Sequence, residues 1–387
     1  MTDPNRFLIA PVSGPAQMKT FITLPRRLYA GLPGWVSPLD MQQRDVFSPK
    51  YNPFFLHGRA QYFLAWQGER PVGRISAQVD ELQLARGGQK TGYFGALDAA
   101  EPEIVAALLD AAEQWLRDQG MERMLGPCAL NTNGEYGLMT EGQMVPPMLA
   151  MPWHPVWLAG AVEAAGFRQA MDLLSYIMET GPDAEAAHRL PRGLTPGEGR
   201  LGDLSVRQLN RKNIEEDGEI LRRLYNESWE NTWGFVPITK EEIRGLIRDI
   251  RPFLRDELLV LVEKAGVPVA IALVLPNLFD VAGDLGGAPS PAGWLKLGWR
   301  LLRHKFTSAR VILLGVSREV TGTALGAMLP ALMISELMKR GRTLPYRRIE
   351  LGWVLETNTP MRGLIERIVP EPSKRHRVYE KMLTGGN

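Results

Sequence analysis

The chain has 387 residues, a formal net charge of +2 and 45% hydrophobic residues. This length is more than one hydrophobic core usually serves, so two domains are expected. The near-neutral charge argues against a nucleic-acid-binding protein, and the composition is that of a soluble globular protein.

The sequence also argues against membrane-spanning and metal-binding proteins. It has no signal-peptide pattern and no apolar run of about 18 residues, so we expect a cytoplasmic protein without a transmembrane helix. The five histidines are not at metal-ligand spacing from one another or from Cys128, so no metal site is expected. Cys128 is the single cysteine and has no basic neighbour in sequence, which favours a small buried residue over a nucleophile.

The first half of the chain alternates strand and helix signals. Apolar runs at 61–66 and 72–79 flank a Gly/Pro turn and predict a β-hairpin. The elements expected after it are a strand at 93–97, a helix at 102–119 with Gly120 as its C-cap, a strand at 124–125, a helix at 156–165 and a strand at 173–178.

The second half repeats this order. The stretch between Gly181 and Gly202 is rich in Pro, Gly and Arg and predicts the domain boundary, which gives domains at 1–195 and 200–387. The elements expected after it are helices at 213–229 and 240–250, a hairpin from 258–263 to 269–275, a strand at 311–316, a helix at 322–340, a strand at 348–354, a helix at 358–368 and a strand at 377–382. A right-handed βαβ crossover would place its loop at the carboxyl end of the strand, where ligands usually bind.

The loop within 315–329 carries the most informative pattern, because it follows an apolar strand and opens a long helix. Small residues there let an anion approach the backbone, and the N–H groups at the helix N-terminus favour its charge. A tight turn that only packs the helix on the strand would have the same appearance. The loop by itself leaves both interpretations open.

This loop resembles the pyrophosphate loop of the GNAT superfamily of acyl-CoA N-acyltransferases, which reads (Gln/Arg)-x-x-Gly-x-(Gly/Ala). Thr321 stands in the Gln/Arg position without its charge or reach, Ala324 replaces the first Gly, and Gly326 takes the second small position. The resemblance implies an α/β (α+β) chain of two tandem GNAT-like domains, each with a mixed, mostly antiparallel sheet and flanking helices. It also implies an acyl-CoA site formed by Val316, Thr321, Gly322, Thr323, Ala324, Leu325 and Gly326.

The segment 349–358, the short helix after it and the strand at 377–381 follow the order of a GNAT domain. The resemblance implies that Asn358 contacts the pantetheine arm, although Asn is also a common helix N-cap. The family often places a Tyr general acid on this helix. Ile365 stands at that position here, so the role is unfilled or supplied elsewhere.

The implied chemistry is direct transfer of an acyl group from coenzyme A to an amine. The backbone N–H near Val316 would stabilise the oxyanion, and a base would deprotonate the amine. Glu356 and Glu350 are the candidates for the base, with a solvated or salt-bridged carboxylate as the alternative for each.

Two further clusters are candidates for substrate binding. Residues 225–237 contain Asn226, Trp229, Asn231 and Trp233, which either wall the acceptor site or pack in the core, with the core favoured for Trp229. Asn133 and Glu135 lie in a Gly/Asn-rich stretch that forms a substrate loop or an ordered turn. The first half has carboxylates at 98–103 instead of a Gly loop, so the N-terminal domain is expected to have lost acyl-CoA binding.

Residues 291–306 predict an amphipathic helix. Basic side chains occupy about one third of its circumference, and Trp and Leu occupy the opposite side. Such a helix lies on the inner face of an anionic membrane as a peripheral contact or covers a lipid substrate. The alternative is a helix packed on its domain with a solvated basic face.

Over about nine tenths of its length the chain resembles a bacterial tandem-GNAT family to which bacterial ceramide synthases belong. The carrying segments are 93–96, 126–127 with 133–135, 226–237, 314–316 and 350–358. The resemblance implies an acyl-CoA-dependent N-acyltransferase that acts on a small-molecule or lipid amine, such as a long-chain sphingoid-type base. An aminoacyl-tRNA-dependent transferase and a non-catalytic acyl-CoA-binding or scaffold protein are the alternatives.

Overall fold

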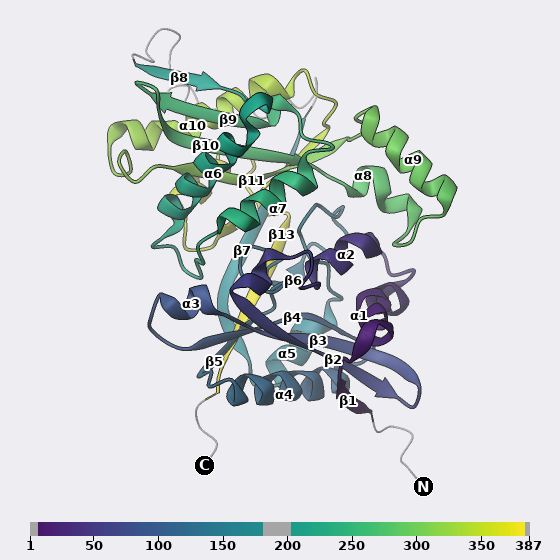
Figure 1. Cartoon of the computed structure of the whole chain (residues 1–387). Helices are drawn as coiled ribbons and strands as arrows, with labels where there is room; N and C mark the ends of the chain where they lie inside the picture. The colour runs from purple at the N-terminus through teal and green to yellow at the C-terminus, as the bar shows by residue number, and fades with distance from the viewer. Residues whose placement is uncertain (1–6, 181–202, 384–387) are drawn as a thin grey trace. The chain divides into compact units, whose positions relative to one another are not determined.

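The computed structural model describes residues 7–180 and 203–383, which form two compact units traced in Figure 1. Unit 1 comprises residues up to Leu173, Ala282–Ser290 and Lys374 onward. Unit 2 comprises Leu174–Val281 and Pro291–Ser373. The domain boundary expected between Gly181 and Gly202 lies outside the described residues.

Unit 1 is built on a mixed sheet. Its strands, in spatial order, are β1 (Leu8–Pro11), β2 (Gly58–Gln67), β3 (Arg70–Asp80), β4 (Thr91–Ala99), β5 (Arg123–Gly126), β13 (Lys374–Met382) and the first half of β7 (Arg168–Glu179), with β6 (Leu138–Glu141) also paired to β13. Only β4 and β5 are parallel among the pairs of known register in this unit. The sheet is therefore mostly antiparallel, as expected.

Helices cover both faces of this sheet. Alternate residues of a strand point to opposite faces. Phe63 and Ala65 accordingly pack with α4 (Pro102–Asp118) and α5 (Trp157–Ala164). Tyr62 and Leu64 pack on the other side with α1 (Gly14–Tyr29). The short helices α2 (Asp40–Val46) and α3 (Glu81–Ala85) complete this unit.

Unit 2 repeats the plan. Its strands, in spatial order, are the second half of β7, β12 (Arg348–Leu355), β11 (Ser308–Val316), β10 (Val267–Pro276), β9 (Leu259–Lys264) and β8 (Leu204–Arg207). The pair of β11 and β12 is parallel, and β8 to β11 are antiparallel neighbours. The helices are α6 (Ile214–Trp229), α7 (Lys240–Ile250), α8 (Phe279–Ala282), α9 (Pro291–Leu302), α10 (Ala324–Gly341) and α11 (Thr359–Ile365).

The two faces of the second sheet carry different helices. Leu314 and Val316 of β11 pack with Leu329 and Met333 of α10. Gly315, which points the opposite way, faces Trp229 of α6. Helix α6 therefore covers the face opposite α10, and α7 lies beside α6 (Figure 1).

The α/β class and the predicted order of elements are confirmed, with shifts of a few residues at their ends. The helix expected at 291–306 ends at Leu302, and His304 follows with a φ of 47°, which a helix does not continue. The final strand β13 belongs to unit 1, whereas β7 enters unit 2 from Leu174. Each strand was predicted from its local sequence, which does not indicate the unit that it joins.

His154 is buried in unit 1, where its Nδ1 accepts the backbone N–H of Met139 at 3.1 Å. Burial, opposed by Asp98 and assisted by Arg74, lowers its pKa from the usual 6.5 to about 4. The unfolded chain therefore binds one more proton between these pH values, so His154 destabilises the fold as the pH falls through this window.

We expect the wild-type free energy of unfolding to fall by up to about 3 kcal/mol through His154 between pH 7.5 and 4. Urea titrations of the wild type and His154→Gln at several pH values measure this. The difference between the two proteins should shift in favour of the variant at low pH. A pH-independent difference would contradict the neutral, buried imidazole.

Candidate active site

Strands β11 and β12 separate before they end. Their parallel pairing runs from Ser308 with Arg348 to Val311 with Leu351. Strand β11 continues to Val316 and β12 to Leu355 without further pairing between them. From Ile312 to Val316, the edge of β11 that faces away from β10 therefore has no strand paired with it among the described residues. We call it the open edge.

A β-bulge coincides with this separation. In the antiparallel pair with β10, Leu273 is opposite Leu313 and Val274 is opposite Val311, which leaves Ile312 as the extra residue. A bulge bends its strand and increases the local twist. Because the bulge follows directly after the last residue paired with β12, it accounts for the divergence of the two strands.

The backbone of Val316 points to the open edge. The N–H of Ser317 donates to the carbonyl of Val269 in β10 at 2.7 Å. Neighbouring residues of a strand direct their backbone groups to opposite edges, so the N–H and carbonyl of Val316 point away from β10. The Val316 carbonyl accepts the hydroxyl of Ser228 at 2.7 Å. The Val316 N–H thus points to the open edge and has no bonded acceptor within 203–383.

The loop after β11 turns tightly into α10. The Thr321 hydroxyl donates to the Ser317 carbonyl at 2.9 Å. Thr323 is the N-cap of α10, and its hydroxyl accepts the N–H of Gly326 at 3.1 Å. A Cβ atom on Gly326 would lie 2.1 Å from the Val320 carbonyl oxygen. Only glycine permits this close approach of the loop to the helix.

Backbone N–H groups are available as donors at the N-terminus of α10. Within 203–383, no acceptor bonds to the N–H groups of Gly322, Ala324 and Leu325, and Gly322 and Ala324 are exposed. The helix dipole adds partial positive charge at this point. The nearest cation in sequence, Arg318, forms an ion pair with Glu230. The loop can therefore bind an anion through its backbone N–H groups rather than through a charged side chain.

The end of α6 lies against the end of β11. A Cβ atom on Gly315 would lie 2.7 Å from the Trp229 ring and 3.0 Å from the Ser228 hydroxyl, so glycine permits this approach. Glu227 accepts the hydroxyl of Ser317 at 3.2 Å and also pairs with Arg223 at 3.3 Å. Its side chain is about one third exposed (32%) and so remains reachable from solvent. The Glu227 carboxylate is thus bonded to Ser317, the residue that follows Val316.

The aromatic cluster after Tyr225 has a packing role. Tyr225 stacks on Trp229 at 5.0 Å and contacts Phe235 at 5.8 Å. Asn226 donates to the Ile238 carbonyl at 3.1 Å and accepts the Ile238 N–H at 2.9 Å. These two bonds fasten the loop that follows α6. Asn231 is exposed on that loop and Trp233 is partly buried.

The other residues expected on β12 and α11 occupy different surroundings. Glu350 is fully buried and lies opposite Arg310 in the paired part of the two strands. Glu356 follows the end of β12, and its carbonyl accepts Arg362 at 2.9 Å. Asn358 is the N-cap of α11 and accepts the Met361 N–H at 3.3 Å. Ile365 is buried in the core, so its side chain offers no general acid.

In unit 1, the corresponding edge is the edge of β4 beyond its pairing with β5, and a segment of the chain covers it. The parallel pairing of β4 with β5 ends at Tyr93 with Leu125. The Cys128 N–H then donates to the Phe94 carbonyl at 2.8 Å. The Cys128 carbonyl oxygen would lie 1.8 Å from a Cβ atom on Gly95. This edge is therefore covered by the protein's own backbone.

Charges around β4 are also satisfied within unit 1. Asp98 is buried and paired with Arg74 at 2.7 Å. Burial raises the pKa of the Cys128 thiol, which disfavours the nucleophilic thiolate. The end of β4 thus carries a buried carboxylate that is paired within the unit.

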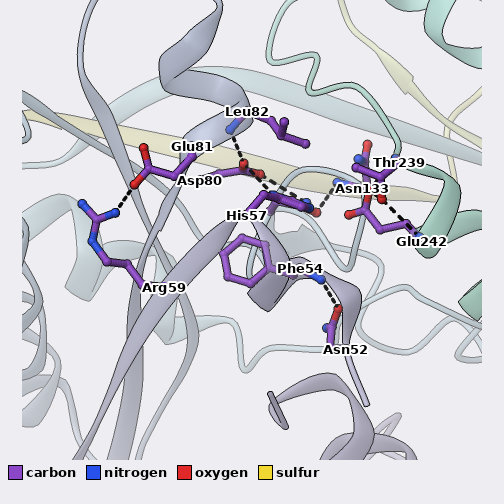
Figure 2. A network of polar contacts seen from close by, with 11 residues as sticks. Asn52, Phe54, His57, Arg59, Asp80, Glu81, Leu82, Asn133, Thr239 and Glu242 are labelled. Atoms are coloured by element: carbon purple, nitrogen blue, oxygen red, sulfur yellow. Dashed lines mark hydrogen bonds and ion pairs between the residues drawn. The ribbon is translucent and has the colours of Figure 1, made fainter. Parts of the chain in front are cut away.

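Asn133 and Glu135 belong to a short turn of unit 1. The Glu135 carbonyl accepts the Ala129 N–H at 2.8 Å, and the Asn133 N–H donates to Asn131 at 3.0 Å. Figure 2 shows the Asp80 carboxylate with His57 and Leu82 bonded to it. That carboxylate faces His57 Nδ1 at 3.1 Å, and it accepts the Leu82 N–H at 2.9 Å and the Asn131 amide at 3.3 Å. Asn133 and Glu135 therefore lie in unit 1, whereas the open edge is part of unit 2.

The chain has two full-length relatives among curated proteins. It is 38% identical to the bacterial ceramide synthase of Caulobacter vibrioides over 97% of both chains. It is 36% identical to protein YghO of Escherichia coli over 95% of this chain and 93% of that protein. The chain belongs to their family. No model of a described protein family matches it.

Solved structures show the fold of this family. A tandem GNAT protein from the clavulanic acid biosynthesis pathway superposes with a TM-score of 0.58 at 13% identity, covering 99% of this chain and 100% of that one. A GCN5-related N-acetyltransferase from Sphaerobacter thermophilus gives a TM-score of 0.51 at 12% identity, covering 100% and 98%. The tandem-GNAT fold expected from the sequence is confirmed.

Sequence reasoning missed several polar residues of this tandem-GNAT chain. Glu227 and Ser228 lie within the 225–237 run, but their neighbours Asn226 and Trp229 were selected instead. Nothing local marks them, because their contacts are with Ser317 and Val316, about 90 residues further along the chain. His57 and Asp80 are 23 residues apart and had no local signal.

Among residues 7–180 and 203–383, no three His, Cys, Asp or Glu side chains gather as metal ligands would. The same residues contain no helix with the length and apolar character needed to cross a bilayer.

The bonds of Asn226 predict a structural effect. We expect Asn226→Ala to lower the free energy of unfolding by about 2 kcal/mol or more, because both backbone groups of Ile238 lose their partner. Urea denaturation measures this. Asn231→Ala, an exposed neighbour, is the control and should change stability little. Equal stability of the two variants would show that the Asn226 bonds contribute nothing.

Proposed function

We propose that unit 2 transfers an acyl group from acyl-CoA to a primary amine, and that the preferred acceptor is a long-chain, sphingoid-type base. The observation that carries the proposal is the open edge of β11, with the Val316 N–H directed to it and the unpaired N–H groups of α10 beyond it. The 38% identity to a bacterial ceramide synthase supports the choice of acceptor, since a ceramide is an N-acylated long-chain base.

The residues present fit acyl-CoA in two respects. A strand edge that lacks a neighbour can bond to an extended amide-containing chain, and pantetheine is such a chain. The N–H groups of Gly322, Ala324 and Leu325 suit a diphosphate, with Thr323 and Gly326 shaping the turn. Thr321 points back to Ser317 and would contribute little to that anion.

The proposed reaction balances as follows. The ammonium form of the acceptor loses one proton to a base, and the neutral amine nitrogen then attacks the thioester carbon. The oxyanion accepts the Val316 N–H while the C–N bond forms. The nitrogen then loses a second proton as the C–S bond breaks, and the departing thiolate of coenzyme A takes up one proton in its place. The products are the amide, free coenzyme A and one released proton.

Two carboxylates are candidates for the base. Glu356 is the candidate from the sequence, and it lies just beyond the end of β12. Glu227 is the candidate that the contacts favour, because it bonds to Ser317 beside Val316 and its side chain is partly exposed. Glu350 is a weaker candidate, since it is fully buried where the strands are still paired. We assign the proton transfer to Glu227.

Unit 1 would then serve the protein without acyl-CoA of its own. The Cys128 segment covers the edge of β4, and Asp98 near the end of β4 is paired with Arg74. Both features support the expectation that only unit 2 retains a coenzyme A site.

The coenzyme A proposal predicts a specific effect of one methyl group. Gly326→Ala places a Cβ atom against the Val320 carbonyl, so the loop must move away from its present shape. We expect the affinity for acyl-CoA to fall at least about tenfold, measured by calorimetry across short to long acyl chains. Gly341→Ala is the matched control, because nothing lies within 4 Å of a Cβ atom there.

Unchanged affinity in Gly326→Ala, or no acyl-CoA binding by the wild type, would refute the site. Binding without turnover over a panel of amines would select the non-catalytic acyl-CoA-binding protein. Salt-sensitive binding of tRNA would select the aminoacyl-tRNA-dependent enzyme.

For the base, we expect Glu227→Gln to lower kcat by at least about 100-fold at neutral pH, with acyl-CoA affinity retained. The loss should be much smaller with an amine of low pKa, which is already deprotonated. Glu219→Gln on the same helix is the control. Full activity in Glu227→Gln together with loss of transfer in Glu356→Gln would move the role to Glu356.

A further inference from the structure

Helix α9 carries an exposed apolar strip. Its outer residues are Trp294, Leu295, Trp299 and Leu302, which are 40%, 78%, 53% and 88% exposed. At 100° per residue, Leu295, Trp299 and Leu302 fall within about 60° of one another, so they form one ridge along the helix. Single exposed apolar residues are ordinary, but a ridge of this kind indicates a partner.

The helix is held to unit 2 by its other side. Leu297 is buried, and Arg300 donates to the Val281 carbonyl at 2.8 Å. In the turn after the helix, His304 bonds to Tyr346 at 3.0 Å and Phe306 is buried. The anchoring contacts thus include two basic side chains, and the ridge faces solvent. This differs from a helix that packs its apolar side inward and exposes only a basic face.

Cationic side chains border the ridge. Lys296, Arg303 and Lys305 are exposed. The Lys305 ammonium lies 5.9 Å from the centre of the Trp299 ring, which keeps the charge beside the apolar surface. None of the residues from Pro291 to Lys305 is acidic. The whole segment therefore presents apolar and positive groups only.

We propose that α9 docks the protein on an anionic phospholipid membrane. Tryptophan at the edge of an apolar ridge suits the headgroup region, and the flanking Lys and Arg attract anionic lipid. The helix would lie in the plane of the interface, with Leu295, Trp299 and Leu302 inserted among the upper acyl carbons. The contact, which extends the proposed function, would bring the enzyme to a long-chain acceptor held in the bilayer.

Co-sedimentation of the full chain with vesicles tests the proposal. We expect binding to phosphatidylcholine vesicles with about one third phosphatidylglycerol, and weaker binding to phosphatidylcholine alone or at high salt. Replacement of Leu295, Trp299 and Leu302 by Ser should weaken binding at least about tenfold. Arg303→Glu with Lys305→Glu should abolish the preference for anionic vesicles.

The matched control replaces three exposed apolar residues that lie elsewhere, Leu56, Val156 and Val267, by Ser. It should bind vesicles as the wild type does. Trp299→Phe should reduce the quenching of fluorescence by brominated lipid, which reports insertion directly.

Absence of wild-type binding to anionic vesicles, or equal binding by the ridge variant, would overturn the proposal. The ridge variant could instead change its oligomeric state without a change in vesicle binding. That result would assign the ridge to contact with a second copy of the chain and refute membrane docking. Acyl transfer to a short soluble amine is measured in parallel. Its failure in the wild type would refute the proposed enzyme and leave the vesicle result intact.

Discussion

The separation of β11 from β12 after Val311 is the constraint on which the candidate site depends. A parallel pair normally bonds along its length, and here the bulge at Ile312 turns β11 away. The backbone groups of Val316 then face an edge without a strand. An N–H in this position can serve an oxyanion without the cost of removing it from a sheet ladder.

The edge of β4 in unit 1 and the edge of β11 in unit 2 correspond in the fold but differ in what covers them. In unit 1, Cys128 bonds to Phe94, and Gly95 leaves room for the Cys128 carbonyl. In unit 2, the helix α6 approaches Gly315 from the face of the sheet, and its Ser228 hydroxyl bonds to the Val316 carbonyl, but no strand pairs with the edge. Glycine is required in both places, but it admits a backbone in one and an indole ring in the other. Two copies of one architecture can thus leave this edge unpaired in one unit and cover it with backbone in the other.

Much of the fold was predictable because its signals are local. The periodicity of 102–119 and 322–340 predicts helices within a few residues of α4 and α10. The Gly- and Pro-rich turns place the hairpins. The strand exchange was not predictable, because nothing in residues 174–179 or 374–382 states which sheet they enter. Of the site, the loop at 321–326 was apparent from its small residues, whereas Glu227 depends on a contact with Ser317 that is 90 positions away in the chain.

The sequence by itself determined the α/β class, the order of the elements, the loop before α10 and the apolar and basic content of α9, since periodicity, turn residues and composition act over short distances. The tertiary structure alone decided that β11 leaves β12, that Cys128 covers the edge of β4, and that α9 turns its Trp and Leu ridge outward. Each of these depends on which segment occupies a shared space, and close packing settles that only when the distant segments are in place.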